Sequence, residues 1–341
     1  MKPVHKLIIS VLFTALALVI PRLLMAEATI DVLMVESPYA PKPSAEVRTV
    51  DKLEGKVFIN GQFYSGSLEV MHDNNGLYVV NKLPFERYLE AAVAYEAGRN
   101  REVEAVKAQA VISRTLAVFQ TRYSNENLSI SPGISHILSE NKDTEPVVIY
   151  ALKTTKDEIL TYKGIPVKAF FHAACDGKTE LPEELWGESY SYIKSVDCNL
   201  NSLIHETWQK KIRTSEIEKA LGTTGLKEIS IISYTSTGRV KTLKISSDSP
   251  EPLSINVMDF RKLLGDTDLP SNQFSIERSG EYTVFRGAGN GHAVGFCQRC
   301  AVEMARQGKN YREILLHYFP GTEIQKVDYL KFRAAKSREQ E

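Results

Sequence analysis

The chain has 341 residues, 43% of them hydrophobic, which is enough for about two domains with buried cores. Its 42 basic and 42 acidic residues cancel, so bulk charge gives no reason to expect binding to nucleic acid or to an anionic membrane. The sequence contains no internal repeat, and its low-complexity content is limited to a short charged tail at its end.

The first 26 residues have the layout of a signal peptide. Lys2 and Lys6 precede an apolar run at 7–20, and Pro21 then interrupts the run before a possible cleavage site. The run is short for a membrane span, so we expect export to the periplasm or cell envelope. Leu24 is larger than the residue usual near a cleavage site, which leaves an uncleaved membrane anchor as the alternative. Residues 27–46 contain three prolines and are expected to be a linker.

Short strands are expected from residue 47 to residue 80. Two glycine turns, Asn60-Gly61 and NNG at 74–76, each separate a pair of apolar segments, and this pattern predicts two β-hairpins. The hydrophobic period then changes, because Pro84 is placed to begin a helix that ends near Glu96. A second helix is predicted at 102–122 from an apolar stripe at spacings of three and four residues, formed by Ala105, Ala108, Ile112, Leu116 and Phe119.

The break between these two helices carries a single acid, Glu96. Lys107 and Arg114 lie seven residues apart on the second helix, so they are expected to share a face away from its apolar stripe. A carboxyl group held against apolar neighbours favours its neutral form and can act as a general acid. A solvated acid at a helix end is the commoner explanation, so Glu96 alone does not define a site.

The remaining elements alternate between short strands and short helices. A polar loop is expected at 125–145. The predicted strands are at 147–150, 158–162 and 167–172. Residues 203–280 contain a helix with a capping box at Ser215 and Glu218 and a hairpin around 235–238. The last predicted helices are at 296–307 and 311–318.

This order of elements predicts an α+β fold. We expect a mixed, β-rich core, formed by 47–202 and 281–325, that includes a catalytic helical segment. Residues 203–280 would form a smaller inserted α/β unit, and residues 326–341 a charged tail.

The sequence has four cysteines, Cys175, Cys198, Cys297 and Cys300. In an exported protein cysteines more often form disulfides than bind metal, and a bond between Cys175 and Cys198 is the expectation. His172 stands three residues before Cys175, so metal ligation and thiol hydrolysis are the alternatives. For the Cys-x-x-Cys pair at 297–300, packing or a disulfide is favoured over redox activity.

A glycine-rich run at 287–291 precedes His292. No Gly-Lys-Ser/Thr follows it and its glycine spacing is not that of a dinucleotide site, which argues against a phosphate loop. The pattern instead predicts a tight backbone that lets His292 face a cleft at a helix N-terminus. The positive end of the helix would favour the neutral imidazole there, or would attract an anion.

Several segments, taken together and in order, resemble the SpoIID/LytB domain family, which contains the sporulation protein SpoIID and amidase enhancers. The similarity spans about residues 50–325. Its segments are VVNKLPFERYL around Pro84, AYE at 94–96, EAVKAQAVISRT at 104–115, AFFH at 169–172, GKTE at 177–180, LWG at 185–187, GNGHAVGFCQ at 289–298 and YFPGT at 318–322. Each segment is common by itself, and their shared order makes the resemblance specific.

The resemblance implies a protein that acts on peptidoglycan glycan strands. Enzymatic members are lytic transglycosylases that cut between N-acetylmuramic acid and N-acetylglucosamine, on strands whose stem peptides have been removed. The catalytic glutamate of the family's Tyr-Glu motif falls on Glu96, after Tyr95. The family's functional arginine falls on Arg114, which would hold Glu96 in place or bind the lactyl carboxylate of the muramic acid. The other residues expected to bind substrate or support the site are Lys107, His172, Lys178, Thr179, Glu180, Asn290, His292 and Gln298.

The sequence also departs from the family. Some members bind zinc through a cysteine pair in the loop after the long helix, but the loop at 125–145 has no cysteine here. We therefore expect no metal at that loop and no cofactor. The family's Gly-His-Gly becomes Gly291-His292-Ala293, which narrows the backbone freedom after the histidine.

The resemblance implies that Glu96 acts alone. It would first protonate the glycosidic oxygen and then remove the proton of the muramic acid C6 hydroxyl, which gives a 1,6-anhydro end without water. This scheme differs from the two carboxylates of most glycoside hydrolases. The sequence leaves open which acid stabilises the developing positive charge, and the candidates are Asp176, Glu180 and Asp197.

Two other functions remain open at this point. A non-catalytic protein could hold peptidoglycan with the same cleft, using aromatic side chains such as Tyr95 and Trp186, and enhance a partner cell-wall amidase. A thiol amidase would instead depend on Cys175. The membrane would be a partner only if the N-terminal segment stays uncleaved.

Overall fold

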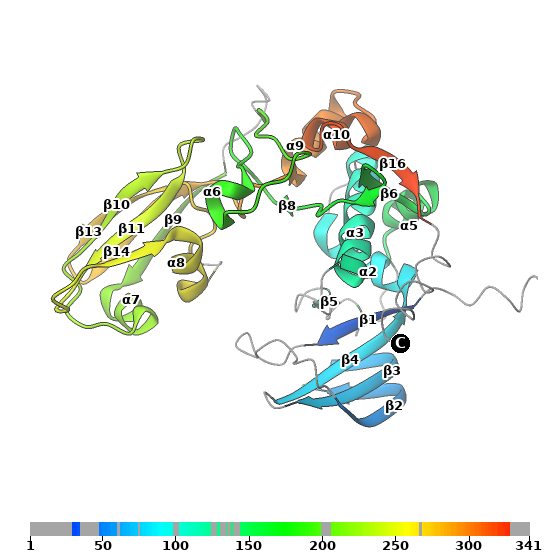
Figure 1. The fold of residues 1–341 in the computed structure, drawn as a ribbon, viewed down its shortest axis with the longest axis horizontal. Coiled ribbons are helices and arrows are strands. Elements are labelled where there is room, and N and C mark those ends of the chain that lie inside the picture. Colours follow the sequence, from blue (N-terminus) through cyan, green and yellow to red (C-terminus); the bar gives the residue numbers. More distant parts are fainter. Residues whose placement is uncertain are drawn as a thin grey trace, which may run out of the picture. The chain divides into compact units, whose positions relative to one another are not determined.

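The computed structural model describes residues 29–34, 48–59, 62–73, 76–97, 102–123, 128–129, 134, 138, 144–198, 206–265 and 268–327. The predicted signal peptide, most of the expected linker and nearly all of the charged tail lie outside these residues. In the described part of the chain, no helix combines the length and the apolar character that crossing a bilayer requires. Helices and small sheets are both present along the described chain, in runs of each kind, which confirms the α+β class (Figure 1).

The first of two compact units comprises Met1–Ala91 and Glu126–Lys142. Its described part is a five-stranded sheet in the order β2-β3-β4-β1-β5. The strands are β1 (Thr29–Met34), β2 (Arg48–Ile59), β3 (Gln62–Asp73), β4 (Gly76–Pro84) and β5 (Leu128–Ser129).

Both predicted hairpins of this sheet are confirmed. β2 pairs antiparallel with β3 up to Ile59 opposite Gln62, and β3 pairs with β4 up to Asp73 opposite Gly76. Strand β1 lies within the range expected to be a linker, where it pairs antiparallel with β4. A short strand between prolines and polar residues carries little hydrophobic period of its own, so its pairing is decided by the neighbouring strand.

The second unit comprises Ala92–Asn125 and Asp143–Glu341, and the boundary falls within helix α2 (Phe85–Ala97). Its larger core surrounds helix α3 (Val103–Tyr123). The elements packed against α3 are α5 (Pro146–Thr154), β6 (Glu158–Tyr162), β7 (Ile165–Pro166), α9 (Gln298–Arg306) and α10 (Tyr311–Tyr318).

Helix α3 is buried on nearly all sides rather than along one stripe. Ala105, Ala108 and Ile112 are at most 3% exposed, as the predicted stripe requires. Arg114 was expected on the opposite, polar face, yet it is 0% exposed. A helix that is enclosed by other elements has no polar face, so α3 is the central helix of this unit.

One predicted strand is wrong. Residues 147–150 belong to helix α5, which begins with Pro146 in its first turn. A short run of β-branched and aromatic residues cannot be distinguished from a buried helix by its period alone. Pro146 was the usable signal, because proline is favoured in the first turn of a helix.

Two small sheets complete this core. Strand β6 lies between β7 and β16 (Glu323–Lys326), and the β6–β7 turn has positive φ at Lys163 and Gly164. Only Phe171–His172 of the strand expected at 167–172 is extended and paired, as β8. It runs parallel to β15 (Phe296–Cys297), with His172 opposite Cys297.

A second core lies in the chain segment between α6 (Pro182–Trp186) and β15. Its two three-stranded sheets have the orders β10-β11-β12 and β13-β14-β9. The elements are β9 (Thr207–Arg213), α7 (Thr214–Leu221), β10 (Glu228–Tyr234), β11 (Val240–Ser246), β12 (Leu253–Asn256), α8 (Val257–Leu264), β13 (Phe274–Ser279) and β14 (Tyr282–Ala288).

The hairpin predicted around 235–238 is confirmed by the antiparallel pairing of β10 with β11. The capping box predicted for α7 is wrong, because Arg213 is the N-cap residue and makes no side-chain cap. Glu218 instead accepts a hydrogen bond from the Leu226 amide at 2.7 Å. Strand β14 lies beyond residue 280 yet pairs with both β13 and β9. The exact domain boundaries stay a prediction.

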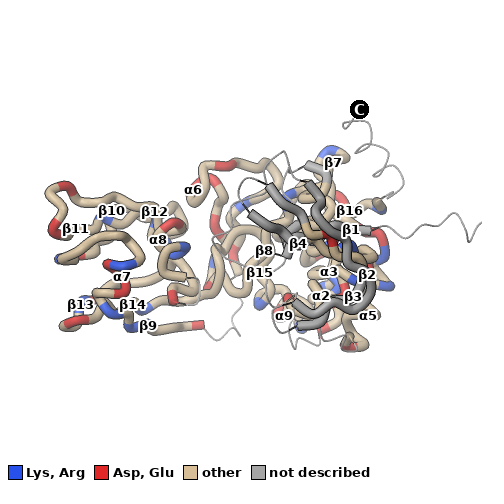
Figure 2. The backbone as a smooth tube through the Cα atoms, turned by 90° about the horizontal axis from the view of Figure 1, so that it is seen from below, with Lys and Arg blue, Asp and Glu red and all other residues tan. Residues whose placement is uncertain are grey.

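Lys and Arg positions are interspersed with Asp and Glu positions along the described backbone of the second unit, without a long run of one sign (Figure 2). This distribution agrees with the net charge of zero. It gives no basic stripe of the kind that nucleic-acid binding proteins carry.

Candidate active site

Glu96 lies in the last turn of α2, beside a small pocket. The pocket has a volume of about 180 Å³. Its lining residues come from the end of α2, the first turns of α3 and the start of α9, and they are Glu96, Ala97, Ala105, Gln109, Phe296, Gln298, Arg299 and Val302. The structure therefore brings together two residues that the sequence singled out, Glu96 and Gln298.

Gln298 holds Glu96 through direct hydrogen bonds. Its Nε2 donates to the Glu96 backbone oxygen at 3.0 Å and to the Glu96 carboxylate Oε2 at 3.3 Å. The same Nε2 lies 3.2 Å from Oε1 of Gln109, and Gln109 Nε2 donates to Ser113 Oγ at 3.2 Å. A chain of two amides and one hydroxyl thus runs from α3 to the acid.

The environment of Glu96 favours its neutral form. Burial raises the pKa of the Glu96 carboxyl above its usual value, and the hydrogen bond from Gln298 offsets part of that rise. A carboxylic acid with a raised pKa keeps its proton closer to neutral pH, as a general acid must.

Glu96 is the one acid among the described residues that line this pocket, and Arg299 is the one cation. The Arg299 guanidinium forms an ion pair with Glu206 at 2.9 Å. The candidates for a second carboxylate, Asp176, Glu180 and Asp197, do not line it.

Arg114 lies in a different environment from Glu96. Its Nη1 donates to the backbone oxygens of Thr155 at 2.9 Å and Glu158 at 3.3 Å. These carbonyls connect the end of α5 to the start of β6. Because Arg114 is 0% exposed, its guanidinium cannot meet a substrate. These contacts indicate that Arg114 holds α5 and β6 together, whereas the resemblance led us to expect it beside Glu96.

Lys107 and Tyr95 are also placed away from the acid's hydrogen bonds. The Lys107 ammonium pairs with Glu104 at 2.6 Å and lies over the rings of Tyr150 and Tyr311, at 5.4 and 5.8 Å from their centres. Tyr95 is 45% exposed, on the outer side of α2. It remains accessible to a ligand.

The two predicted histidines lie together, with ring centres 5.7 Å apart. His172 is buried, and its Nδ1 bonds to the Val294 carbonyl at 3.1 Å, while Nε2 has no partner among the described residues. His292 accepts the Val294 amide on Nδ1 at 3.0 Å. Burial, with the neighbouring His172 and Arg261, lowers the pKa of His292 to about 3, which favours the neutral ring.

Aromatic side chains surround His292. The rings of Phe170 and Trp186 stack at 5.2 Å, and Trp186 meets His292 edge to face at 5.3 Å. Trp186 is 36% exposed. The backbone of Phe296, which lines the pocket of Glu96, bonds to the Phe170 carbonyl at 3.0 Å, so this aromatic group adjoins the strand that carries the pocket wall.

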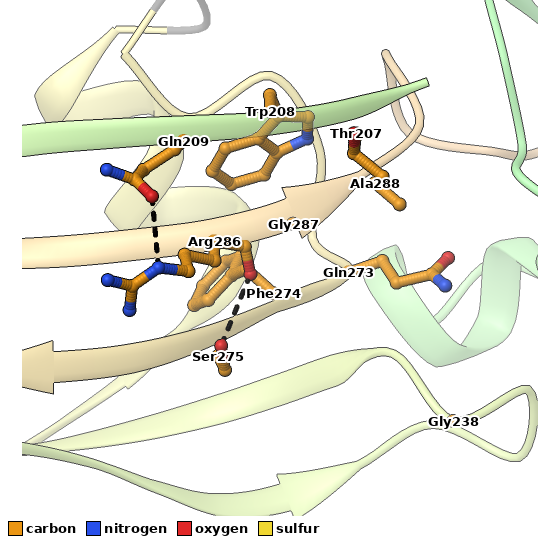
Figure 3. Close-up of a pocket in the computed structure, with 10 residues that line it drawn as sticks. All are labelled: Thr207, Trp208, Gln209, Gly238, Gln273, Phe274, Ser275, Arg286, Gly287 and Ala288. Atoms are coloured by element: carbon orange, nitrogen blue, oxygen red, sulfur yellow. Dashed lines mark hydrogen bonds between the residues drawn. The ribbon is translucent and has the colours of Figure 1, made fainter. Parts of the chain in front are cut away.

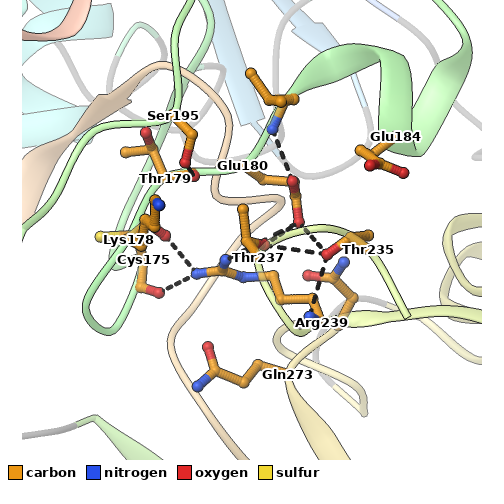
Figure 4. A network of polar contacts seen from close by, with 12 residues as sticks. Cys175, Lys178, Thr179, Glu180, Glu184, Ser195, Thr235, Thr237, Arg239 and Gln273 are labelled. Carbon is orange, nitrogen blue, oxygen red and sulfur yellow. Dashed lines mark hydrogen bonds and ion pairs between the residues drawn. The ribbon is translucent and has the colours of Figure 1, made fainter.

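The GKTE segment serves the fold more than a binding surface (Figure 4). Thr179 and Glu180 are 0% exposed. The Thr179 hydroxyl accepts the Val196 amide at 2.8 Å, and Glu180 Oε2 accepts the Thr235 hydroxyl at 2.6 Å. Lys178 exposes its side chain while its carbonyl accepts Arg239 Nη2 at 2.6 Å. The structure does not bring these three residues to Glu96.

Asn290 is likewise held by its backbone. Its amide and carbonyl bond to Ala174 at 2.8 and 2.9 Å, while its side chain is exposed. The tight backbone predicted here is present, with Gly289 and Gly291 at positive φ. A Cβ on Gly291 would approach Cβ of His172 to 2.8 Å, so the glycine permits the close contact between these segments.

The four cysteines differ most from expectation. All four are buried and free, so the expected bond between Cys175 and Cys198 is not present in the structure. Their sulfurs lie within 4.8 Å of one another, and among the described residues they form the group suited to a metal ion.

A second, larger hollow lies on the sheet β13-β14-β9 and contains none of the predicted site residues (Figure 3). Trp208 lies over Gly287, where an added Cβ would come within 2.3 Å of the indole. Arg286 on its rim donates to Gln209 at 3.0 Å. No acid lines it among the described residues, so it does not repeat the arrangement around Glu96.

Sequence reasoning missed Gln109, Ser113 and Arg299. A signal for the first two existed, because both are polar residues that recur with Ala105 at four-residue steps on a buried face. Their partner Gln298 is 189 residues away from Gln109, so no local pattern could show the contact. Arg299 had no local signal beyond its position next to Gln298.

Comparisons with known proteins agree with this arrangement. Residues 73–162 match the SpoIID family, described as stage II sporulation protein. The chain is 30% identical over 279 residues to an uncharacterized protein of Brachyspira hyodysenteriae, covering 80% of this chain and 74% of that protein. It is 28% identical over 282 residues to stage II sporulation protein D of Bacillus subtilis, covering 73% and 76% of the two chains.

A further relative is the amidase enhancer of Bacillus subtilis. The two are 23% identical over 292 residues, which cover 69% of this chain and 40% of the enhancer. The residues matched by the family, 73–162, include Glu96. On these grounds the chain belongs to the SpoIID/LytB family of stage II sporulation protein D.

Proposed function

We propose that this protein acts on the bacterial cell wall as a peptidoglycan lytic transglycosylase, with Glu96 as its single acid and base. The observation that carries the proposal is the Glu96 site itself. A half-buried carboxyl with a raised pKa faces a pocket, and no second acid lines that pocket among the described residues. Stage II sporulation protein D and the amidase enhancer, as named relatives, support a role at the cell wall.

The chemistry follows from one acid that changes its role. Glu96 in its neutral form donates its proton to the glycosidic oxygen, and the bond from that oxygen to C1 of the muramic acid residue breaks. The C6 hydroxyl of the same sugar attacks C1, and the Glu96 carboxylate takes the hydroxyl proton. The product is a 1,6-anhydro end, water is not consumed, and Glu96 has recovered its proton.

The surroundings of Glu96 suit both steps. Burial favours the neutral acid before the first step, and the Gln298 amide stabilises the carboxylate after it. Arg299 is the cation placed to attract the lactyl carboxylate of muramic acid, a role that the sequence assigned to Arg114. The exposed rings of Trp186 and Tyr95 offer apolar faces on which sugars can stack.

Digestion of purified glycan strands tests the proposal. Strands with and without stem peptides are incubated with the wild type, with Glu96→Gln and with Glu90→Gln, and their ends are identified by mass. Glu90 lies on the same helix and pairs with Arg87 at 3.2 Å, so it is a matched control. We expect anhydro ends from the wild type and Glu90→Gln, and a loss of at least about 100-fold for Glu96→Gln.

Two results would overturn the proposal. Equal release of anhydro ends by Glu96→Gln would show that another group is the acid. Reducing ends in place of anhydro ends would show hydrolysis by water and would require a second carboxylate. The substrate lies outside the cytoplasm, so the proposal also requires export, which the predicted signal peptide at 1–26 would provide.

The similarity to the amidase enhancer carries a second candidate, a non-catalytic protein that holds glycan and assists a cell-wall amidase. The two candidates differ in the role of the acid. If binding alone is the function, the wild type releases no fragments, accelerates an added amidase and keeps this effect as Glu96→Gln. The transglycosylase proposal predicts fragments without any amidase present.

A further inference from the structure

Four sulfur atoms meet in the larger core of the second unit. They come from chain segments far apart: Cys175 follows β8, Cys198 lies in the loop after α6, and Cys297 and Cys300 flank the start of α9. Their Sγ atoms all lie within 4.8 Å of one another. Each cysteine is at most 2% exposed, and together they are all the cysteines of the chain.

The sulfur distances suit a shared ion better than covalent pairs. Cys297 and Cys300 have their Sγ atoms 3.2 Å apart, and Cys175 and Cys300 have theirs 3.9 Å apart. A disulfide requires about 2.0 Å. Four thiolates at about 2.3 Å from a central zinc ion lie about 3.8 Å from each other in a tetrahedron. The observed cluster needs only a small adjustment to reach that geometry.

The backbone around the cluster is built to hold these positions. The turn after Cys175 has positive φ at Asp176 and Gly177, and the Cys198 amide bonds to the Gly177 carbonyl at 2.7 Å. On the other side, the Arg299 amide bonds to the Ala173 carbonyl at 3.0 Å. The two loops and the helix start are therefore joined independently of any bond between the sulfurs.

The charge of such a site would be partly balanced. Zinc with four thiolates carries a net charge of −2, which a buried site must compensate. The Arg239 guanidinium is 3% exposed and donates to the Cys175 carbonyl (Figure 4). It interacts electrostatically with Glu180 first and then with Cys175 and Cys198, so its charge is shared between the Glu180 carboxylate and the cluster. The N-terminus of α9, which carries Cys300 in its first turn, adds the positive end of a helix dipole.

We propose that Cys175, Cys198, Cys297 and Cys300 bind one Zn²⁺ ion in a closed structural site. Binding displaces the four thiol protons and leaves four Zn–S bonds, with no change of oxidation state. Four soft sulfur ligands in a tetrahedral set select zinc over hard cations, and full burial leaves no open position for a water or substrate. This site replaces the disulfide between Cys175 and Cys198 that the sequence led us to expect.

The proposed zinc site lies next to residues that contact Glu96. Gln298 lies between the two ligands of α9, and its amide holds the Glu96 carboxylate. His172 is opposite Cys297 in the β8–β15 pair and three residues before Cys175. The ion would therefore fix the start of α9 against the turn that follows β8. This would keep the Gln298 amide within hydrogen-bond distance of the Glu96 carboxylate. The four cysteines are positioning residues, and the ion does not take part in sugar chemistry.

Metal analysis of the full chain tests the site without using activity. The protein is produced with zinc in the medium, passed over a weak chelating resin, and its metals and free thiols are measured in denaturant. We expect about one zinc per chain and four thiols that react after denaturation with chelator. Cobalt introduced in place of zinc should give the intense near-ultraviolet absorption of thiolate ligands.

Two variants distinguish the ligand set. Cys198→Ser should lose most of its zinc on the resin. His172→Gln should keep its zinc, because the ligand atoms that lie within 4.8 Å of one another are the four sulfurs and include no nitrogen of His172. If a cysteine variant fails to fold, the cobalt spectrum and the thiol count of the wild type still show whether four thiolates bind one ion. Two disulfides with no metal, iron in place of zinc, or zinc retained by Cys198→Ser would each overturn the proposal.

Discussion

Gln298 decides how strongly the Glu96 carboxyl holds its proton. The apolar surroundings favour the neutral form, and the Gln298 amide is the contact that favours the charged form. One donor thus offsets part of the effect of burial, which keeps the carboxyl able both to give and to take a proton. A stronger donor would leave less of Glu96 protonated near neutral pH, and removal of the donor would leave less of it ionised.

Removing this donor should move the pH dependence of cleavage. In the proposed reaction Glu96 is the general acid and must be protonated, so activity should fall as the pH rises through the pKa of Glu96. Gln298→Ala removes the contact that lowers this pKa, so the high-pH limb should shift to higher pH, with a maximum rate about tenfold lower. The rate profile of Gln307→Ala, altered at the far end of α9, is the control. A limb that stays in place would show that Gln298 does not act on Glu96.

His292 should make the fold sensitive to acid. Its pKa is about 3 in the folded chain, below the usual value of about 6.5, so between these values the unfolded chain binds a proton that the folded chain does not. Stability from this group is intact above pH 6.5 and is lost as the pH falls toward 3, at up to about 1.4 kcal/mol per pH unit.

The groups that face His292 are His172 and Arg261, both of which oppose its charge. His292→Gln removes the titration, so its free energy of unfolding, measured by urea denaturation from pH 7 to pH 4, should fall less steeply than that of the wild type. Equal slopes for the two proteins would contradict a buried neutral imidazole.

At the scale of elements, α3 performs two separate tasks along its length. Its first half presents Gln109 and Ser113 toward the amide chain that ends at Glu96. Its second half carries Arg114, which holds the carbonyls of Thr155 and Glu158 between α5 and β6. The side chains that connect to Gln298 and the arginine that fastens α5 to β6 are thus on one helix but contact different neighbours.

Arg114 should matter for folding and not for the chemistry of the acid. Arg114→Met removes the guanidinium donor from the carbonyls of Thr155 and Glu158, although the Glu158 amide still bonds to the Thr155 oxygen at 3.1 Å. This loss should cost roughly 2 kcal/mol in the free energy of unfolding. The pH profile of cleavage should keep its shape. Arg87→Met, which removes a surface pair with Glu90, should cost under about 1 kcal/mol. If folded Arg114→Met has a shifted pH profile, then Arg114 acts on Glu96, as the family resemblance implies.

The sequence predicted local elements well where chemistry between neighbouring residues decides them. Glycine turns specified the hairpins, and apolar residues at spacings of three and four specified α3. The prediction failed at 147–150, where a short β-branched run lies in a helix that packs against α3. It also failed for the environment of Arg114, because a helix period does not reveal that other elements cover the polar side.

The candidate site was predictable only in part, for the same reason. The resemblance identified Glu96 and Gln298, and the structure joins them. The meeting of four cysteines depends on contacts between residues up to 125 positions apart, such as Cys175 and Cys300. Spacing along the chain gives a Cys-x-x-Cys pair but cannot identify its other two neighbours.

At the scale of the molecule, Glu180 joins two cores of the second unit. Its Oε1 accepts the Leu181 amide at 2.8 Å, and its Oε2 accepts hydroxyl groups from the hairpin between β10 and β11. Arg239 from the same hairpin lies 4.0 Å from that carboxylate and donates to the carbonyl of Cys175. The hairpin is thus fastened to the loop that carries the first proposed zinc ligand.

Weakening this link should loosen the hairpin first. Glu180→Gln replaces one of the two buried acceptor oxygens with a donor, which should cost about 2 kcal/mol and raise amide hydrogen exchange at residues 235–239. The exposed Glu183→Gln, three residues away, should leave this exchange unchanged. Unchanged exchange in Glu180→Gln would show that the second core is held by its other contacts.

The amide chain from Ser113 to Glu96 has a direction as well as a length. The two ends of a glutamine amide are alike in shape but opposite in polarity, so reversing one amide reverses the next. In the observed order, Ser113 accepts from Gln109, Gln109 accepts from Gln298, and Glu96 accepts last. A side chain at 113 that could only donate would turn both amides round and present an oxygen to Glu96. The contact from residue 298 would then favour the neutral carboxyl, whereas it now favours the charged form. The buried side chain at position 113, which contacts no substrate, would thus decide whether residue 298 raises or lowers the pKa of Glu96.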